Sequence, residues 1–255
     1  MAESVKSAER ALRIIELLTN DGALDFPDIC TLLNLPKSSA HSLLATMRDM
    51  GFVHLDETSR LYTLGPRLWE AGQAYIEQQD IARLAEPFMR RVRDELGETV
   101  QLAILDGMEN VYVGKLETDH ALQLVSRLGS RLPAYATGLG KALLAELADD
   151  EVLRRLDGVE LRQFTATTIT DRSKLIAELA RIRRRGYSTD TGEYTAGVYC
   201  VAAPIYGPTG VVAAMSVSIP DVRVTTLVRR HAAQMVTAET RALSAQLGRP
   251  SVMST

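Results

Sequence analysis

Two short helical patterns separated by a tight break constrain the fold of this chain more than any other feature. The first pattern ends at Leu33, the second begins near Lys37, and Asn34, Leu35 and Pro36 lie between them. Proline removes a backbone donor and disfavours helix in the residue before it, so neither helix continues through the break. Two helices joined by such a turn are typical of the helix-turn-helix unit, whose second helix enters the major groove of DNA.

Apolar spacing predicts the helices around this break. Positions three and four apart indicate one helix from about Val5 to a stop at Gly22, and a short one that starts at Pro27 after the cap residue Asp25. The third helix follows the break and ends at Gly51. The residues expected to be buried are Val5, Ala8, Ala11, Leu12, Ile15 and Leu18 in the first helix, Ile29, Leu32 and Leu33 in the second, and Ala40, Leu43, Leu44 and Met47 in the third.

Two predicted strands follow at once. Residues 52–55 and 61–64 flank the polar turn 56–60, which predicts a hairpin. A hairpin directly after a recognition helix is a wing, so residues 1–65 are predicted to form a winged helix-turn-helix DNA-binding domain. The side chains expected to contact DNA are Lys37, Ser38, Ser39, His41, Ser42, Arg48 and Arg60.

Charge gives this prediction little support. Residues 1–65 carry six basic and nine acidic side chains, a net charge of −3. Affinity for DNA depends largely on basic side chains that neutralise phosphates. DNA binding would therefore need Lys37, Arg48 and Arg60 on one face and oligomerisation to multiply a weak contact. The alternative, a ligand-binding scaffold whose helix-turn-helix unit contacts protein, stays open.

The rest of the chain divides into a connector and a larger domain. Residues 66–80 are predicted to form a linker helix, in which Trp69 is expected to pack between domains or subunits. Residues 81–250 are predicted to be an effector-binding domain, followed by a tail, 251–255. This domain is expected to be α+β, with an antiparallel sheet and flanking helices. Its expected strands are 100–105, 111–116, 121–128, 197–206 and 210–219, and its expected helices are 81–96, 149–156, 171–185 and 222–247, with a loop that turns into helix over 134–145.

Composition argues against several classes of protein. No stretch has the length and apolar character of a membrane span, and the first residues lack the pattern of a secretory signal, so we expect a cytoplasmic protein. The two cysteines, Cys30 and Cys200, lie far apart and are expected to be free thiols. A Cys200-dependent enzyme is the less favoured alternative, because no histidine lies near Cys200 in sequence and there is no G-x-S-x-G motif. The histidines show no metal-ligand spacing, so we expect no enzymatic activity, metal or cofactor.

A glycine-rich segment, 137–140, begins a helix in the second domain. Free backbone N–H groups and the helix dipole would favour an anion in front of it. It is no P-loop, because Tyr135 and Ala142 replace the first glycine and the hydroxyl residue of that motif. Ser216 and Ser218, two apart in a predicted strand, would lie on one sheet face and line one wall of a pocket. The alternative is that the glycines only permit tight packing.

Taken in order, these segments resemble the IclR family of bacterial transcription regulators. The matching residues are 7–12 (SAERAL), 35–41 (LPKSSAH), 61–65 (LYTLG), the glycine-rich segment, and the polar residues of the later strands. The match covers nearly the whole chain, and its specificity lies in the order and spacing of the segments. One departure is Ser42, where the family usually has arginine, which leaves the operator preference open.

The resemblance implies a GAF-like effector domain, homodimers through the N-terminal region, and often homotetramers through the effector domains. We expect a small carboxylate effector to close the effector domain and, through the linker helix, to change the spacing of paired DNA-binding domains on operator DNA. Whether the effector releases or recruits the protein, as repressor or activator, is left open. The positions that the resemblance places in the effector pocket are Leu132, Ala136, Gly138, Leu139, Asp190, Cys200, Ser216 and Ser218.

Overall fold

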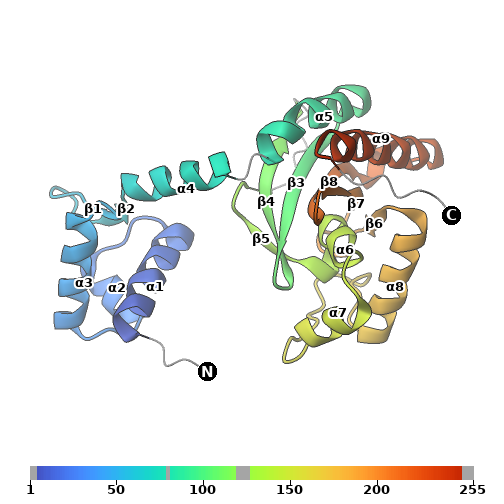
Figure 1. The fold of residues 1–255 in the computed structure, drawn as a ribbon. Coiled ribbons are helices and arrows are strands. Elements are labelled where there is room, and N and C mark those ends of the chain that lie inside the picture. The colour runs from blue at the N-terminus through green and yellow to red at the C-terminus, as the bar shows by residue number, and fades with distance from the viewer. Residues whose placement is uncertain (1–4, 79–80, 119–126, 249–255) are drawn as a thin grey trace. The chain divides into compact units, whose positions relative to one another are not determined.

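The structure is a computed structural model that describes residues 5–78, 81–118 and 127–248. The chain divides into two compact units, residues 1–79 and 80–255. The elements of the first unit, labelled in Figure 1, are α1 (Lys6–Asp21), α2 (Phe26–Leu32), α3 (Lys37–Asp49), β1 (Val53–Leu55), β2 (Tyr62–Leu64) and α4 (Pro66–Gln78). The predicted winged helix-turn-helix order is therefore confirmed.

Local chemistry explains where these helices begin and end. The Asp25 carboxylate caps α2 by accepting the N–H of Asp28 at 2.8 Å. Asn34 adopts a left-handed conformation, with φ of 48°, and the Leu35 N–H donates to the Cys30 carbonyl at 2.9 Å. These bonds close the turn between α2 and α3, so that α3 can start directly after Pro36.

The predicted buried stripe of α1 is wrong in part. Val5 and Leu12 are 68% and 61% exposed, and Ala8 is also exposed, whereas Ile14 and Leu18 are buried. Two apolar stripes run along this helix, and spacing alone does not say which one faces the core. Leu32 of α2 is likewise exposed. The core of the first unit is formed by Ile14, Leu18, Ile29, Leu44, Met47 and Val53.

The second unit is a six-stranded antiparallel sheet covered by helices on both faces. The sheet order is β5-β4-β3-β8-β7-β6. Its strands are β3 (Thr99–Asp106), β4 (Glu109–Leu116), β5 (Arg131–Pro133), β6 (Ser188–Thr191), β7 (Val198–Gly207) and β8 (Gly210–Pro220). Its helices are α5 (Ile81–Leu96), η1 (Ala134–Ala136), α6 (Gly138–Leu144), α7 (Asp149–Arg155), α8 (Arg172–Arg185), η2 (Asp221–Arg223) and α9 (Thr226–Gln246).

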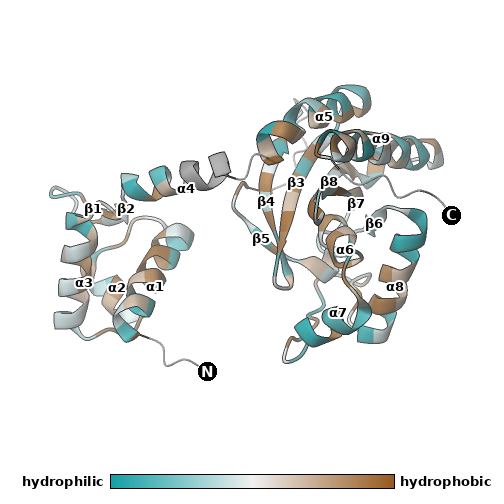
Figure 2. Cartoon of the chain, viewed as in Figure 1, coloured by the Kyte–Doolittle hydropathy of each residue, from teal (hydrophilic) through white to brown (hydrophobic). Residues whose placement is uncertain are grey.

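The two helical layers bury different apolar clusters. Helices α5 and α9 pack on one face of the sheet around Val92, Met215 and Val236, while α6 packs on the other through Leu139 and Leu143. In Figure 2, strand β3 of the sheet is coloured as hydrophobic, whereas the surrounding helices carry hydrophilic stretches. Burial of such apolar area is the main stabilising contribution. None of the described helices has the length and apolar character that crossing a membrane requires.

The two short edge strands, β5 and β6, were not predicted from the sequence. The expected strand 121–128 falls largely on residues 121–126, which lie outside the described residues, and Arg127 and Leu128 are not in a strand. The sheet instead continues with β5, which pairs with β4. Strand β6 was not predicted because its sequence, Ser-Thr-Asp-Thr, lacks the apolar alternation of a half-buried strand.

Candidate functional site

Helix α3 has one buried side and one polar, exposed side. Ala40, Leu44 and Met47 pack into the core of the first unit. The predicted contact residues that are exposed on the opposite side are Lys37, Ser38, His41 and Ser42. The predicted outward orientation of these four side chains is confirmed. Their contact with DNA stays a prediction, which needs such a free polar face.

Two of the predicted serines already form hydrogen bonds inside the unit. Ser39 is half-buried, and its hydroxyl accepts a hydrogen bond from Arg10 Nη1 at 3.1 Å. The Ser42 hydroxyl donates back to the Ser38 carbonyl at 3.1 Å, as serines within helices often do. The side chain of Ser39 therefore positions α3 against α1, while the Ser42 hydroxyl can rotate toward a ligand.

The two outlying arginines lie at the end of α3 and in the hairpin turn. Arg48 is exposed, with its Nε 3.7 Å from an Asp49 oxygen, and Arg60 lies 2.8 Å from Glu57. Exposed ion pairs of this kind contribute little free energy, so either guanidinium can exchange its partner for a phosphate. The turn itself is ordered by Asp56, whose pKa is lowered by the backbone N–H groups of Thr58 and Ser59.

The second unit contains a pocket of about 220 Å³ between the sheet and the start of α6. All six strands or the residues beside them contribute to it. Seven of the eight predicted effector residues line it; Ala136 does not, because it is the last residue of η1 and is fully buried in the core. The lining residues are Gln101, Tyr112, Leu132, Thr137, Gly138, Leu139, Asp190, Tyr194, Thr195, Val198, Cys200, Ser216 and Ser218.

One wall of this pocket is a hydrogen-bonded polar group on neighbouring strands. Ser216 and Ser218 share a sheet face, as predicted, and their hydroxyls lie 3.4 and 3.0 Å from Gln101 Oε1. The Cys200 Sγ lies 3.2 Å from the Ser218 hydroxyl, and burial raises the pKa of this thiol. Sequence reasoning missed Gln101, although a lone amide inside an otherwise apolar strand could have indicated it. Both cysteines are free, as predicted.

Asp190 of β6 continues this wall, because it pairs directly with Cys200 in the sheet, and it is 5% exposed. Its Oδ1 accepts the N–H of Glu193 at 2.7 Å. Burial, reinforced by the nearby Glu193, raises the pKa of Asp190 to about 6 against an ordinary value of 3.8.

Behind the pocket lies a buried ion pair that sequence reasoning also missed. Lys141, only 1% exposed, pairs with Glu193, whose pKa is raised mainly by burial. Among the described residues, Glu193 Oε2 has no hydrogen-bond partner. The pair supports the loop that carries Tyr194 and Thr195 into the pocket.

The start of α6 is held by close packing as well as by its cap. The Thr137 hydroxyl accepts the Gly140 N–H at 3.0 Å and donates to Asn110 Oδ1 at 2.7 Å. A Cβ on Gly140 would lie 2.2 Å from Ala134 Cα, so the packing alternative holds for this glycine. A Cβ on Gly138 would instead meet ordinary contacts at 3.4 Å or more, beside the pocket. Within the described ranges, no three His, Cys, Asp or Glu side chains gather as a metal site would require.

Comparison with known proteins follows the same two-part division. The family model "IclR helix-turn-helix domain" matches residues 7–57, and "Bacterial transcriptional regulator IclR C-terminal" matches residues 73–245. A curated relative, "HTH-type transcriptional repressor AllR" of Escherichia coli, is 38% identical over 225 residues, which is 88% of this chain and 83% of that protein.

Solved structures agree with these matches. The IclR protein of Thermotoga maritima has a TM-score of 0.77 and 30% identity, covering 96% of this chain and 100% of that one. An IclR homologue from Microbacterium hydrocarbonoxydans, solved with 4-hydroxybenzoate, has a TM-score of 0.79 and 28% identity, covering 92% of this chain and 99% of that one.

Proposed function

The chain belongs to the IclR family of bacterial transcriptional regulators, and from this premise we propose that it couples a small organic acid in the pocket of its second unit to the binding of operator DNA by α3. Membership of the family implies two domains, a helix-turn-helix domain that binds DNA and a C-terminal domain that binds a ligand. The class of ligand, the residues that hold it and the DNA-contacting side chains are our proposal.

For the DNA contact, we assign the exposed side of α3 to the major groove. Lys37, Ser38, His41 and Ser42 lie there, and Arg48 and Arg60 are free enough to bind the flanking phosphates. Ser39 takes a supporting part, because its hydroxyl is bound to Arg10.

The polar wall of the pocket, with Asp190 beside it, carries the proposal for the effector. At about 220 Å³ the pocket is smaller than the roughly 300–1,000 Å³ of sites for drug-sized ligands, so it suits a small molecule. The hydroxyls of Tyr112, Ser216 and Ser218 can donate to a carboxylate. An ionised Asp190 would repel that carboxylate, but its raised pKa means that it takes up a proton readily and can then donate as well. The ligand of the Microbacterium homologue, 4-hydroxybenzoate, is likewise a carboxylate.

The first unit also carries exposed apolar side chains that suit a second copy of the chain. Val5 and Leu12 on α1 are more than half exposed, and Trp69 on α4 is 69% exposed. Exposed apolar groups of this size mark interaction surfaces. We assign them to a homodimer that pairs two DNA-binding units, which doubles the contacts of each with the operator.

We further propose that the protein has no catalytic activity and works in the cytoplasm, where its DNA lies. The Cys200 thiol is a poor nucleophile because burial raises its pKa and because no histidine is among the described residues that line the pocket.

A thermal-shift screen tests the assignment of the effector pocket. The probes are small carboxylic acids, each paired with its primary amide, against the wild type and the Ser216→Ala/Ser218→Ala variant. We expect at least one acid, but not its amide, to raise the Tm of the wild type, and the gain to be lost in the variant. Equal effects of acid and amide, or an undiminished gain in the variant, would refute a carboxylate site at this wall.

A further inference from the structure

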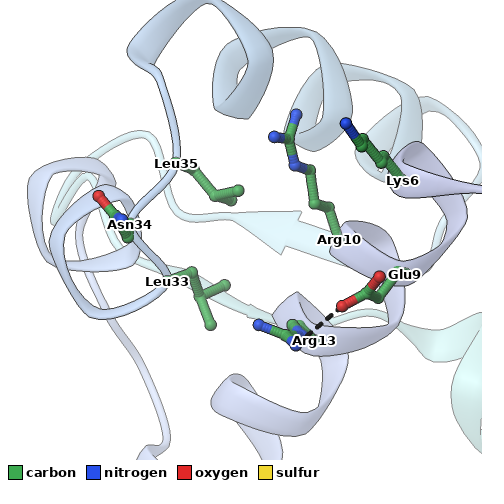
Figure 3. Close-up of a pocket in the computed structure, with 7 residues that line it drawn as sticks. All are labelled: Lys6, Glu9, Arg10, Arg13, Leu33, Asn34 and Leu35. Atoms are coloured by element: carbon green, nitrogen blue, oxygen red, sulfur yellow. Dashed lines mark ion pairs between the residues drawn. The ribbon is translucent and has the colours of Figure 1, made fainter. Parts of the chain in front are cut away.

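A second pocket, of about 300 Å³, lies in the first unit between α1 and the turn that precedes α3 (Figure 3). None of its charged residues is among those predicted to contact DNA. Three of the six basic side chains of residues 1–65 line it, together with one carboxylate. The lining residues are Lys6, Glu9, Arg10, Arg13, Leu33, Asn34 and Leu35.

The basic side chains form one face of α1. Lys6, Arg10 and Arg13 are four and three residues apart, a spacing that places side chains on the same side of a helix. Figure 3 shows them leaving α1 on the side that faces the turn. The bond from Arg10 Nη1 to the Ser39 hydroxyl, 3.1 Å long, ties this face to the first turn of α3.

The pocket explains how an acidic unit can still attract DNA. Among the described residues that line it, the one carboxylate is Glu9, which is 2.8 Å from Arg13; both side chains are more than two-fifths exposed, so the pair is weak. The lining therefore has a net charge of +2, although residues 1–65 together have −3. Positive charge is concentrated beside α3, while the surplus acidic residues lie elsewhere in the unit.

We propose that this pocket binds a backbone phosphate of the operator duplex next to the groove that α3 enters. The proposal deepens the DNA-binding function and depends on it. Guanidinium groups suit phosphate oxygens, and Arg10 still has donors beyond the one that Ser39 accepts. Since Arg10 also holds Ser39, a phosphate bound here fixes the position of α3 along the groove without reading a base.

The test measures the salt dependence of binding by the full-length protein. The probe is a fluorescein-labelled duplex from the region upstream of its own gene, with a scrambled duplex of equal length, at about 50 to 200 mM KCl. The variant is Lys6→Gln/Arg13→Gln, whose two side chains are exposed and not required by the core. The matched control is Lys174→Gln/Arg184→Gln, which removes two exposed positive charges from α8.

One phosphate contact adds about 0.9 to the slope of log K against log salt, so the variant, which loses that contact, should lose about 0.9. If the two proteins bind equally at 1 M salt, this slope change corresponds to a loss of affinity of roughly 8-fold at 0.1 M, on both duplexes alike. The control should keep the wild-type slope. An unchanged slope in the variant, or a loss confined to the upstream duplex, overturns the phosphate pocket while leaving DNA binding intact. A wild type that binds neither duplex overturns the DNA-binding function and this inference together.

Discussion

Replacing Asp190 by Asn should stabilise the second unit at alkaline pH and have a smaller effect at acidic pH. The carboxylate is 5% exposed in the wild type, and its pKa is about 6 against an ordinary 3.8. Asparagine keeps an oxygen that can accept the N–H of Glu193, but it never ionises. The variant thus removes the cost of burying a charge and leaves the acceptor in place.

The size of the effect follows from linkage. Between the two pKa values the folded protein holds a proton that the unfolded chain has released, so the stability present below about pH 4 is lost as pH rises through about 6. At about 1.4 kcal/mol per pKa unit, the cost in the wild type is about 1.6 kcal/mol at pH 5 and about 3 kcal/mol at pH 8. The advantage of the variant should grow by about 1.4 kcal/mol over that range, or about 3–6 °C in Tm.

Scanning calorimetry of the full chain at about pH 5 and about pH 8 measures this difference. The control is Asp157→Asn, which removes an exposed carboxylate of the same unit. Its Tm should differ from that of the wild type by the same amount at both pH values. The reasoning fails if the advantage of Asp190→Asn is independent of pH or shrinks as the pH rises.

Three further substitutions test other parts of the structure. Gly140→Ala should lower the free energy of unfolding in urea by about 1–3 kcal/mol or more, because its Cβ would lie 2.2 Å from the Ala134 backbone. Gly138→Ala should stay within about 1 kcal/mol of the wild type and weaken acid binding by filling the pocket. Equal stability of the two variants would contradict this. Trp69→Gln should shift the protein toward monomer in sedimentation, since its ring is 69% exposed in the unit, and an unchanged mass would exclude Trp69 from the interface. Ser42→Arg should strengthen DNA binding and steepen the salt slope by about 1, because position 42 is exposed on α3; an unchanged slope would place it away from phosphates.

The sequence predicted elements whose rules are local. The cap at Asp25, the break before Pro36 and the apolar face of Ala40, Leu44 and Met47 each depend on residues a few positions apart, so the helix-turn-helix unit could be predicted well. The same holds for the central strands β7 and β8, whose long apolar runs leave little choice.

The features that could not be predicted from the sequence depend on which helix faces and strands pack against each other in the folded chain. Helix α1 has two apolar stripes, and only its packing on α3 selects Ile14 over Leu12. Gln101 reaches the serines of β8 because the strands pair in that register, and Lys141 meets Glu193 across 52 positions. The basic pocket arises in the same way, because α1 faces a turn more than twenty residues further along the chain.

The most direct test of coupling between the two sites is to measure both affinities in one system. Fluorescence anisotropy gives the Kd of the labelled upstream duplex with and without a saturating acid from the screen, and calorimetry gives the Kd of that acid with and without saturating duplex. Linkage requires both ratios to be equal, and a coupling free energy of roughly 1–3 kcal/mol corresponds to factors of about 5–150. We predict equal ratios in that range, which fall to one in Ser216→Ala/Ser218→Ala. A duplex affinity that no bound acid changes would contradict the account.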